Sequence, residues 1–183
     1  MTFTLYTARL LLRELERSDA IELYRIYQDP IVMRFMGPPP SDLDQERANV
    51  ERHRRQSYER YGYGLWATIL RDTGALIGRC GLLRTQIDSR METELSFLLD
   101  RACWGRGYAT EAARAILQAA GQRFGVDRVV AVVHPDNRAS LTALERLGFV
   151  YERDVPYRDF GQVRLYAREG LRGNASSAPS TAA

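Results

Sequence analysis

The chain has 183 residues, of which 45% are hydrophobic and 27% charged, and its formal net charge is +3. This composition is typical of one globular domain, and so small a net charge does not indicate a nucleic-acid partner. All 26 basic residues are arginines, which excludes a lysine nucleophile, a Schiff-base lysine and a lysine-bearing P-loop. Two cysteines, Cys80 and Cys103, indicate neither a disulfide framework nor a metal motif.

The first part of the chain is predicted to form one strand and two helices. The strand covers 2–14, and Ser18 is expected to cap a helix that Asp29-Pro30 ends near residue 28. After the stiff Gly37-Pro-Pro-Pro40 segment, Ser41 is expected to cap an arginine-rich helix that runs to about residue 60. Since that helix has few apolar residues, it is predicted to be peripheral, as a solvated face or as the wall of a binding site.

The rest of the chain alternates between strands and helices. Strands are predicted over 65–70, 75–83, 93–99, 126–134, 149–154 and 163–168, with a hairpin turn over 71–74. Helices are predicted over 110–124 and over 138–147, the latter capped by Asp136 or Asn137. Early hairpins followed by a strand–helix–strand crossover indicate an α/β fold, a mixed sheet with helices on its faces.

The two ends of the chain bear on its organisation and location. The first 15 residues lack the apolar core of a signal peptide, and no apolar run approaches the roughly 20 residues of a membrane span. We therefore expect a cytoplasmic protein with no membrane partner. One domain is predicted over 1–169, and a disordered tail over 170–183, which is rich in Ser, Ala, Gly and Pro.

A glycine turn stands where the predicted strand over 93–99 gives way to the helix over 110–124. Gly105 and Gly107 flank Arg106 there. Such a turn lets backbone N–H groups approach a ligand closely, and the start of the helix carries partial positive charge. Phosphate is the expected ligand. A dinucleotide fingerprint is disfavoured, because Thr110 stands where the third glycine is needed and the turn lies more than a hundred residues into the chain.

Further motifs accompany this turn. The segment Glu94-Leu-Ser-Phe-Leu-Leu99 precedes Trp104-Gly-Arg-Gly-Tyr-Ala-Thr-Glu-Ala112, and Asn137-Arg-Ala-Ser140 is followed by Leu147-Gly-Phe149. Together they resemble the GNAT superfamily of acyl-CoA-dependent N-acyltransferases. The opening Thr7-Ala-Arg9-Leu-Leu-Leu-Arg13 and the Asp29-Pro-Ile-Val-Met-Arg34 segment are most similar to its branch of RimJ- and RimL-type acetylases of ribosomal-protein N-termini. The likeness covers roughly residues 7–169.

The resemblance implies the GNAT fold, a mostly antiparallel twisted sheet with one splayed parallel strand pair, and acetyl-CoA as acyl donor without a metal. It places the CoA pyrophosphate on backbone N–H groups of the turn and the pantetheine arm beside the strand over 93–99. Asn137 matches the asparagine that bonds this arm, although a plain helix cap is its other interpretation. The expected CoA-binding residues are Leu98, Leu99, Trp104, Gly105, Arg106, Gly107, Tyr108, Ala109, Thr110 and Asn137.

The resemblance also suggests which residues take part in catalysis. Glu94 is the candidate base, with a strand-edge salt bridge as its other interpretation. Many family members use a tyrosine acid four residues before the Gly-Phe pair, but Leu144 occupies that position here. Ser140 takes its place in the RimL-like pattern, where its hydroxyl either helps to protonate the departing thiolate or only positions the sulfur. A helix-capping residue is its other interpretation. Tyr108 and Tyr151 are weaker candidates for the acid.

The implied function is an acetyl-CoA-dependent N-acetyltransferase in which an amine attacks the thioester directly. The acceptor is a protein N-terminal α-amine or a small-molecule amine, and a homodimer is one oligomeric option. Deprotonating an α-amine at neutral pH costs about 1.4 kcal/mol against about 4.6 kcal/mol for a lysine amine, so only modest base assistance is needed. The alternative is a non-catalytic acyl-CoA-binding or regulatory module of the same fold, which the leucine at position 144 keeps open.

Overall fold

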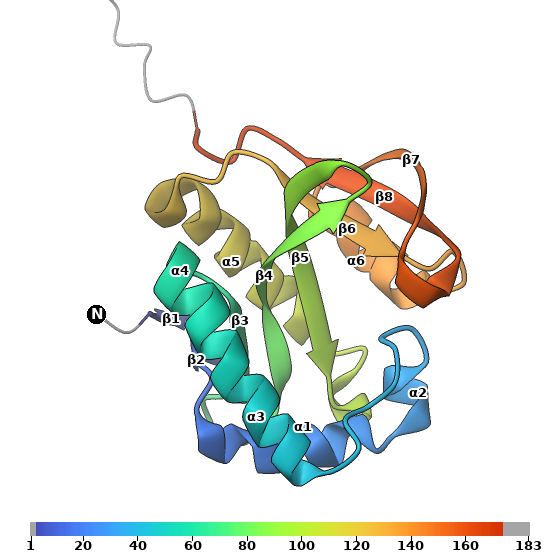
Figure 1. The fold of residues 1–183 in the computed structure, drawn as a ribbon. Coiled ribbons are helices and arrows are strands. Elements are labelled where there is room, and N and C mark those ends of the chain that lie inside the picture. Colours follow the sequence, from blue (N-terminus) through green and yellow to red (C-terminus); the bar gives the residue numbers. More distant parts are fainter. Residues whose placement is uncertain (1–2, 174–183) are drawn as a thin grey trace, which may run out of the picture.

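Eight strands form one mixed sheet in the order β1-β2-β3-β4-β5-β6-β8-β7 (Figure 1). The computed structural model describes residues 3–173 of the chain. Every neighbouring pair is antiparallel except β5 and β6, which confirms the predicted mixed sheet with one parallel pair. The strands are β1 (Thr4–Tyr6), β2 (Leu10–Glu14), β3 (Leu65–Leu70), β4 (Leu76–Ile87), β5 (Arg90–Leu99), β6 (Val129–Val133), β7 (Val150–Pro156) and β8 (Gln162–Arg168).

Helices cover both faces of the sheet. On one face, α1 and α3 pack against a buried group that includes Ala67 of β3 and Leu98 of β5. On the other face, α5 and α6 pack against Trp66 and Leu82, and alanines let α5 lie close to the strands. The helices are α1 (Ala20–Tyr27), α2 (Pro30–Met33), α3 (Leu43–His53), α4 (Glu59–Tyr61), α5 (Tyr108–Phe124) and α6 (Arg138–Arg146). None of those in the described part of the chain is long and apolar enough to span a bilayer.

The first predicted strand is two strands, because Thr7 closes a turn between β1 and β2. Its hydroxyl accepts a hydrogen bond from the Leu10 N–H at 2.9 Å and donates one to Glu111 of α5 at 2.6 Å. The second contact joins residues more than a hundred positions apart. A local hydrophobic pattern carries no sign of it.

The predicted helix over 41–60 is interrupted. Asp42, not Ser41, caps α3 by accepting a hydrogen bond from the Gln45 N–H at 2.7 Å. A π-helical turn over Arg54–Tyr58 separates α3 from the short α4, which ends at Gly62. Ser18 is likewise not a cap, since it lies within a 3-10 turn whose N-cap is Glu16, and the Glu16 N–H donates to the Asp19 carboxylate at 2.8 Å.

The C-terminal end of the fold lies beyond the predicted boundary at residue 169. Leu171 packs against the main core, and its N–H donates to the Asp127 carbonyl at 3.2 Å. Arg172 donates to the Gly125 carbonyl at 2.6 Å, so residues 171 and 172 are docked on the end of α5. The remainder of the predicted tail, 174–183, lies outside the described residues.

The parallel strands β5 and β6 separate almost at once. They share a single paired position, Glu94 with Val130, whereas β5 is paired with β4 along its whole length. Figure 1 shows the two strands diverging from this point. Toward Leu99, the edge of β5 that faces β6 is therefore free to pair with something other than a strand of this sheet.

Candidate active site

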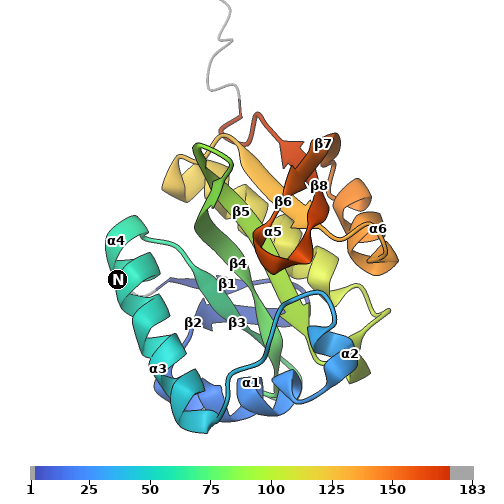
Figure 2. The same ribbon diagram turned by 45° about the vertical axis from the view of Figure 1, so that its right-hand side comes forward.

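A cavity of about 220 Å³ lies where β5 and β6 diverge. Its walls come from both strands, from the start of α6 and from two loops that follow α2 and β7. The two loops approach each other beside the cavity: a Cβ built at Gly37 would lie 3.7 Å from Cζ of Phe160 (Figure 2). The polar side chains in its lining are Arg79, Glu94, Ser96, His134, Asn137, Ser140, Tyr157 and Arg158.

Glu94 is a buried carboxylate in this cavity, 6% exposed. Burial raises its pKa, and a hydrogen bond from Tyr157 and the nearby charge of Arg158 oppose that effect. The Tyr157 hydroxyl donates to Oε2 of Glu94 at 3.0 Å. No ion pair involves Glu94 among residues 3–173, so the salt-bridge interpretation of this residue is wrong. A carboxylate with a raised pKa is suited to accepting a proton near neutral pH.

Asn137 and Ser140 reach the same cavity from the start of α6. The Asn137 side-chain oxygen accepts a hydrogen bond from the Ser140 N–H at 3.2 Å, so the helix-cap interpretation of Asn137 is confirmed. The cap uses only the oxygen, which leaves the amide nitrogen of the same side chain for a ligand. Ser140 serves the cap through its backbone N–H, and the residue is part of the cavity lining. Leu144, one turn further on, forms part of the apolar wall.

The glycine turn lies beyond the carboxyl end of β5, on the side toward which β5 and β6 diverge. Gly105 and Gly107 have φ angles of +72° and +79°, and Gly107 begins the 17-residue α5 without a side-chain cap. Nothing lies within 4 Å of a Cβ built on Gly105. The first N–H groups of α5 at Tyr108, Ala109 and Thr110 are therefore not occupied by a side-chain cap, and free N–H groups at the start of a helix are a common binding site for phosphate.

The Trp104 side chain and the Arg106 backbone hold the turn in place. The Trp104 indole N–H donates to the Leu99 carbonyl at 2.8 Å and so fastens the turn to the end of β5. The Arg106 carbonyl accepts a hydrogen bond from Nη1 of Arg9 at 3.0 Å. Leu98 and Leu99 have buried side chains, so only their backbone groups could face a ligand beside β5.

Arg9 is a residue at this turn that the sequence patterns did not single out. Its guanidinium also forms an ion pair with Glu111 at 2.6 Å and lies 4.4 Å from the centre of the Tyr108 ring. A hydrogen bond from the guanidinium to a turn carbonyl fixes the backbone there. The weaker acid candidates lie elsewhere: Tyr108 packs beneath Arg9, and the Tyr151 hydroxyl donates to Asp154 on the exposed strand β7.

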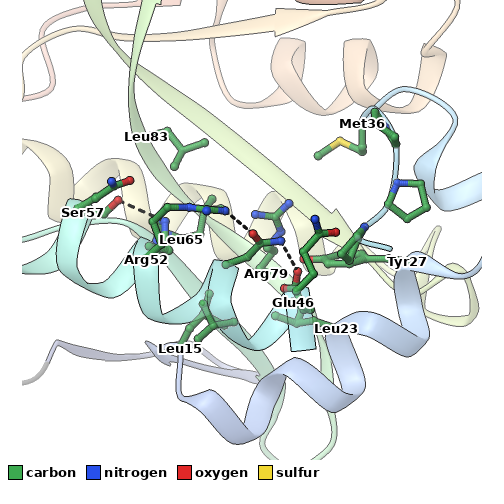
Figure 3. A pocket seen from close by; sticks show the side chains of 18 of the residues that line it. Leu15, Leu23, Tyr27, Met36, Glu46, Arg52, Ser57, Leu65, Arg79 and Leu83 are labelled. Carbon is green, nitrogen blue, oxygen red and sulfur yellow. Dashed lines mark hydrogen bonds between the residues drawn. The ribbon is translucent and has the colours of Figure 1, made fainter. Parts of the chain in front are cut away.

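A second, larger cavity of about 830 Å³ adjoins the first (Figure 3). It lies between α3 and the sheet, and the two cavities share Met36, Arg79 and Leu83. The predicted peripheral helix is thus the wall of a cavity and not only a solvated face. His53 of α3 is part of this wall and accepts a hydrogen bond from the Leu65 N–H at 2.7 Å.

Residues 9–150 match the family described as Acetyltransferase (GNAT) domain. This chain belongs to the GNAT acetyltransferase family. The GNAT relative p20 of Bacillus licheniformis, described as an uncharacterized N-acetyltransferase, is 32% identical over 88% of this chain and 89% of its own length. The family uses acetyl-CoA as its acyl donor.

Solved structures show the same GNAT fold. An acetyltransferase from Agrobacterium tumefaciens strain C58 superposes with a TM-score of 0.77 and 29% identity, over 91% of this chain and 94% of that chain. RimL, described as the ribosomal L7/L12 alpha-N-protein acetyltransferase in complex with Coenzyme A, gives 0.80 at 18% identity, over 93% of this chain and 99% of that chain. At that identity the likeness to RimL concerns the fold alone.

The structure brings together Glu94, Asn137 and Ser140, which sequence motifs had indicated separately. Tyr157 joins them from a loop that is 63 residues from Glu94 in the chain, and no sequence spacing indicates it. Arg79 was also missed, although a signal existed: it is the one charged residue in the apolar stretch Leu76–Leu83.

Proposed function

We propose that this protein transfers an acetyl group from acetyl-CoA to a primary amine, either a protein N-terminal α-amine or a small-molecule amine. The observation that carries the proposal is the position of Glu94, a buried carboxylate in a cavity at the strand splay that adjoins a second, larger cavity. The smaller cavity contains the free edge of β5, where the acyl donor would bind, and the larger cavity beside it has room for the acceptor. Bringing them together could itself contribute about 7–11 kcal/mol to lowering the barrier.

The donor side of this proposal uses backbone groups. The uncapped N–H groups of Tyr108 to Thr110 would hold the pyrophosphate, and the free edge of β5 near Leu98 and Leu99 would pair with pantetheine. Amides at this edge would polarise the thioester carbonyl. The Asn137 amide nitrogen would donate to the pantetheine arm while the side-chain oxygen caps α6.

The acceptor side uses Glu94 as the base that takes the proton of the amine, directly or through a water. Ser140 would lie near the sulfur and donate a hydrogen bond to the departing thiolate. Tyr157 positions the Glu94 carboxylate through the hydrogen bond at 3.0 Å. RimL acetylates a protein α-amine, according to its description, and a protein N-terminus is therefore one of the two acceptor classes.

Thiol release from acetyl-CoA across a panel of amines tests the proposal. The panel contains short peptides with free N-termini, the same peptides with blocked N-termini, and small primary amines. Release that depends on a free amine, together with an acetylated product in the mass spectrum, is the expected result. Tight CoA binding without turnover on any amine would contradict the proposal and favour a non-catalytic CoA-binding module.

The Ser140→Ala substitution separates the two roles considered for the hydroxyl. The helix cap is retained, because Asn137 bonds the backbone N–H of residue 140 and not its side chain. If the hydroxyl only positions the sulfur, kcat is expected to fall up to about tenfold, the effect of one neutral hydrogen bond. If it delivers the proton, kcat is expected to fall by about 10²-fold or more. The Kd for CoA stays unchanged in both cases, and an unchanged kcat would remove Ser140 from the mechanism.

The Tyr157→Phe substitution is expected to move the acid limb of the pH profile of kcat/KM to higher pH. The hydrogen bond from Tyr157 lowers the pKa of Glu94, so its loss raises that pKa, and a higher pH is needed to ionise the base. Tyr151→Phe is the matched control, since its hydroxyl donates to Asp154 outside both cavities. A profile that shifts equally in both variants, or in neither, would contradict the contact between Tyr157 and an essential base.

A further inference from the structure

Arg79 stands at a position of the sheet that is otherwise apolar. On β4 it pairs with Ala67 of β3 and Leu98 of β5, and both of these neighbours are buried in the cluster beneath α1 and α3. An arginine costs free energy at such a position unless its guanidinium finds a partner. The side chain faces the larger cavity, near Glu46 and Tyr27 (Figure 3).

The guanidinium of Arg79 lacks an acidic partner in the part of the chain that the structure describes. Its Nε atom is buried and has no hydrogen-bond partner there, and no carboxylate of residues 3–173 forms an ion pair with it. The Tyr27 ring lies 5.4 Å from Cζ, and the Glu46 carboxylate is near enough for the charge of Arg79 to oppose the burial that raises its pKa. By contrast, the cavity residues Arg52 and Arg84 donate hydrogen bonds to Asn49 and Thr93.

The charge of the larger cavity is positive. Its one carboxylate is Glu46, which is 5% exposed and whose pKa is raised by burial. His53 adds no charge near neutral pH, since burial and the charge of Arg79 lower its pKa to about 4. The cationic side chains in the lining are Arg52, Arg60, Arg79 and Arg84. This excess of positive charge favours an anionic guest.

Arg79 also lies where the two cavities meet, because it belongs to the lining of both. The phosphate groups of CoA are expected elsewhere, at the start of α5 beyond the carboxyl end of β5. A group bound to Arg79 would therefore be part of the second reactant, and its amine could lie toward Glu94.

We propose that Arg79 binds a carboxylate of the amine acceptor. This inference rests on the proposed acetyl transfer and specifies its acceptor as an amine that carries a carboxylate. A guanidinium binds a carboxylate through two parallel hydrogen bonds, which fixes the orientation of the acceptor as well as its affinity. The anion can belong to a small amino acid or to an acidic side chain beside a peptide N-terminus.

Two matched pairs of amines test the inference and distinguish these sources. One pair is 4-aminobutyrate and its amide. The other is a peptide amide with Glu after an N-terminal Ala and the same peptide with Gln in place of Glu. Each pair is measured for kcat/KM with acetyl-CoA and for equilibrium binding to the CoA-loaded protein. The variants are Arg79→Gln and the control Arg55→Gln, which removes an exposed arginine of the neighbouring π-helical turn that is not part of the cavity lining.

The wild-type protein is expected to prefer the anionic member of at least one pair by about ten- to a hundredfold, the effect of hydrogen bonds between charged groups. Arg79→Gln should abolish this preference in turnover and in binding, without a change in the KM for acetyl-CoA, and Arg55→Gln should retain it. Equal use of both members by the wild type would overturn the inference and leave acetyl transfer intact. A rise in the KM for acetyl-CoA in Arg79→Gln, with the preference retained, would also overturn it.

If no amine is acetylated, the proposed transfer fails, and the binding measurements still decide the role of Arg79. Binding of the anionic member that weakens in Arg79→Gln but not in Arg55→Gln would support the anion site. Binding that is equal for both members of each pair would overturn it.

Discussion

The Gly107→Glu substitution is expected to abolish CoA binding and leave the protein folded. Gly107 has a φ of +79° at the start of α5, where a side chain costs roughly 1–2 kcal/mol. The added carboxylate would stand beside N–H groups that are proposed to hold the pyrophosphate, and repulsion between like charges costs several kcal/mol. Since about 1.4 kcal/mol corresponds to a factor of ten, the affinity for CoA should fall by more than about a hundredfold. Isothermal titration calorimetry measures this loss.

Gly74→Glu is the matched control for that experiment. Gly74 lies in the hairpin turn between β3 and β4 with a φ of +72°, and nothing lies within 4 Å of a Cβ built there. The control therefore introduces the same side chain at the same backbone conformation, in a turn that contributes no N–H group to the start of α5. CoA should bind to it as to the wild type. If Gly107→Glu also bound CoA normally, the glycine turn would not be the pyrophosphate site.

The order of elements and the glycine turn could be predicted because both depend on local features. Apolar alternation indicates strands such as β3, and the glycines at positions 105 and 107 indicate a turn at which backbone N–H groups are free. The structure keeps both features where the sequence places them. Asn137 is a further local case, because a side chain that caps a helix needs only the next three residues.

Contacts between distant parts of the chain could not be predicted in this way. The turn between β1 and β2 includes a hydrogen bond from Thr7 to Glu111, and the proposed base Glu94 accepts one from Tyr157 of the loop after β7. Neither contact leaves a periodic pattern in the sequence, because its two residues are far apart in the chain. The π-helical turn after His53 could not be predicted either. It directly follows a residue whose ring accepts a hydrogen bond from Leu65 at the start of β3.

Arg79 and Glu94 make the same physical point from opposite charges. Each is a charged side chain in a strand whose neighbours are apolar, and each lies in a cavity lining. A charged side chain at a core position of a strand lowers the stability of the fold, and such residues are typically found at functional sites. The two residues line one continuous region, with the proposed anion site at its junction and the proposed base further toward β6.

The Glu94→Gln substitution is expected to lower kcat by about 10²–10⁴-fold, the usual effect of losing a general base, with an unchanged Kd for CoA. Glutamine can still accept the hydrogen bond from Tyr157, so the cavity keeps its shape. The part of the acid limb that reports Glu94 should disappear, which leaves only the titration of the amine. Glu92→Gln is the control, because Glu92 lies two residues away on β5 and pairs with Arg128 outside both cavities. A kcat within about twofold of wild type across the profile would remove Glu94 from the mechanism.

The same variant should be at least as stable as the wild type, which separates lost chemistry from lost folding. Burial raises the pKa of Glu94 in the folded state, so the folded protein binds this proton more tightly than the unfolded chain does. The contribution of Glu94 to the free energy of unfolding is therefore largest below the ordinary carboxyl pKa and falls as pH rises through the raised one. Glutamine does not ionise, so the stability of the Glu94→Gln variant does not include this loss. Urea unfolding is measured below the ordinary carboxyl pKa and above the raised pKa of Glu94. The free energy of unfolding of Glu94→Gln, relative to that of the wild type, should increase from the lower pH to the higher one, although the same variant has lost turnover.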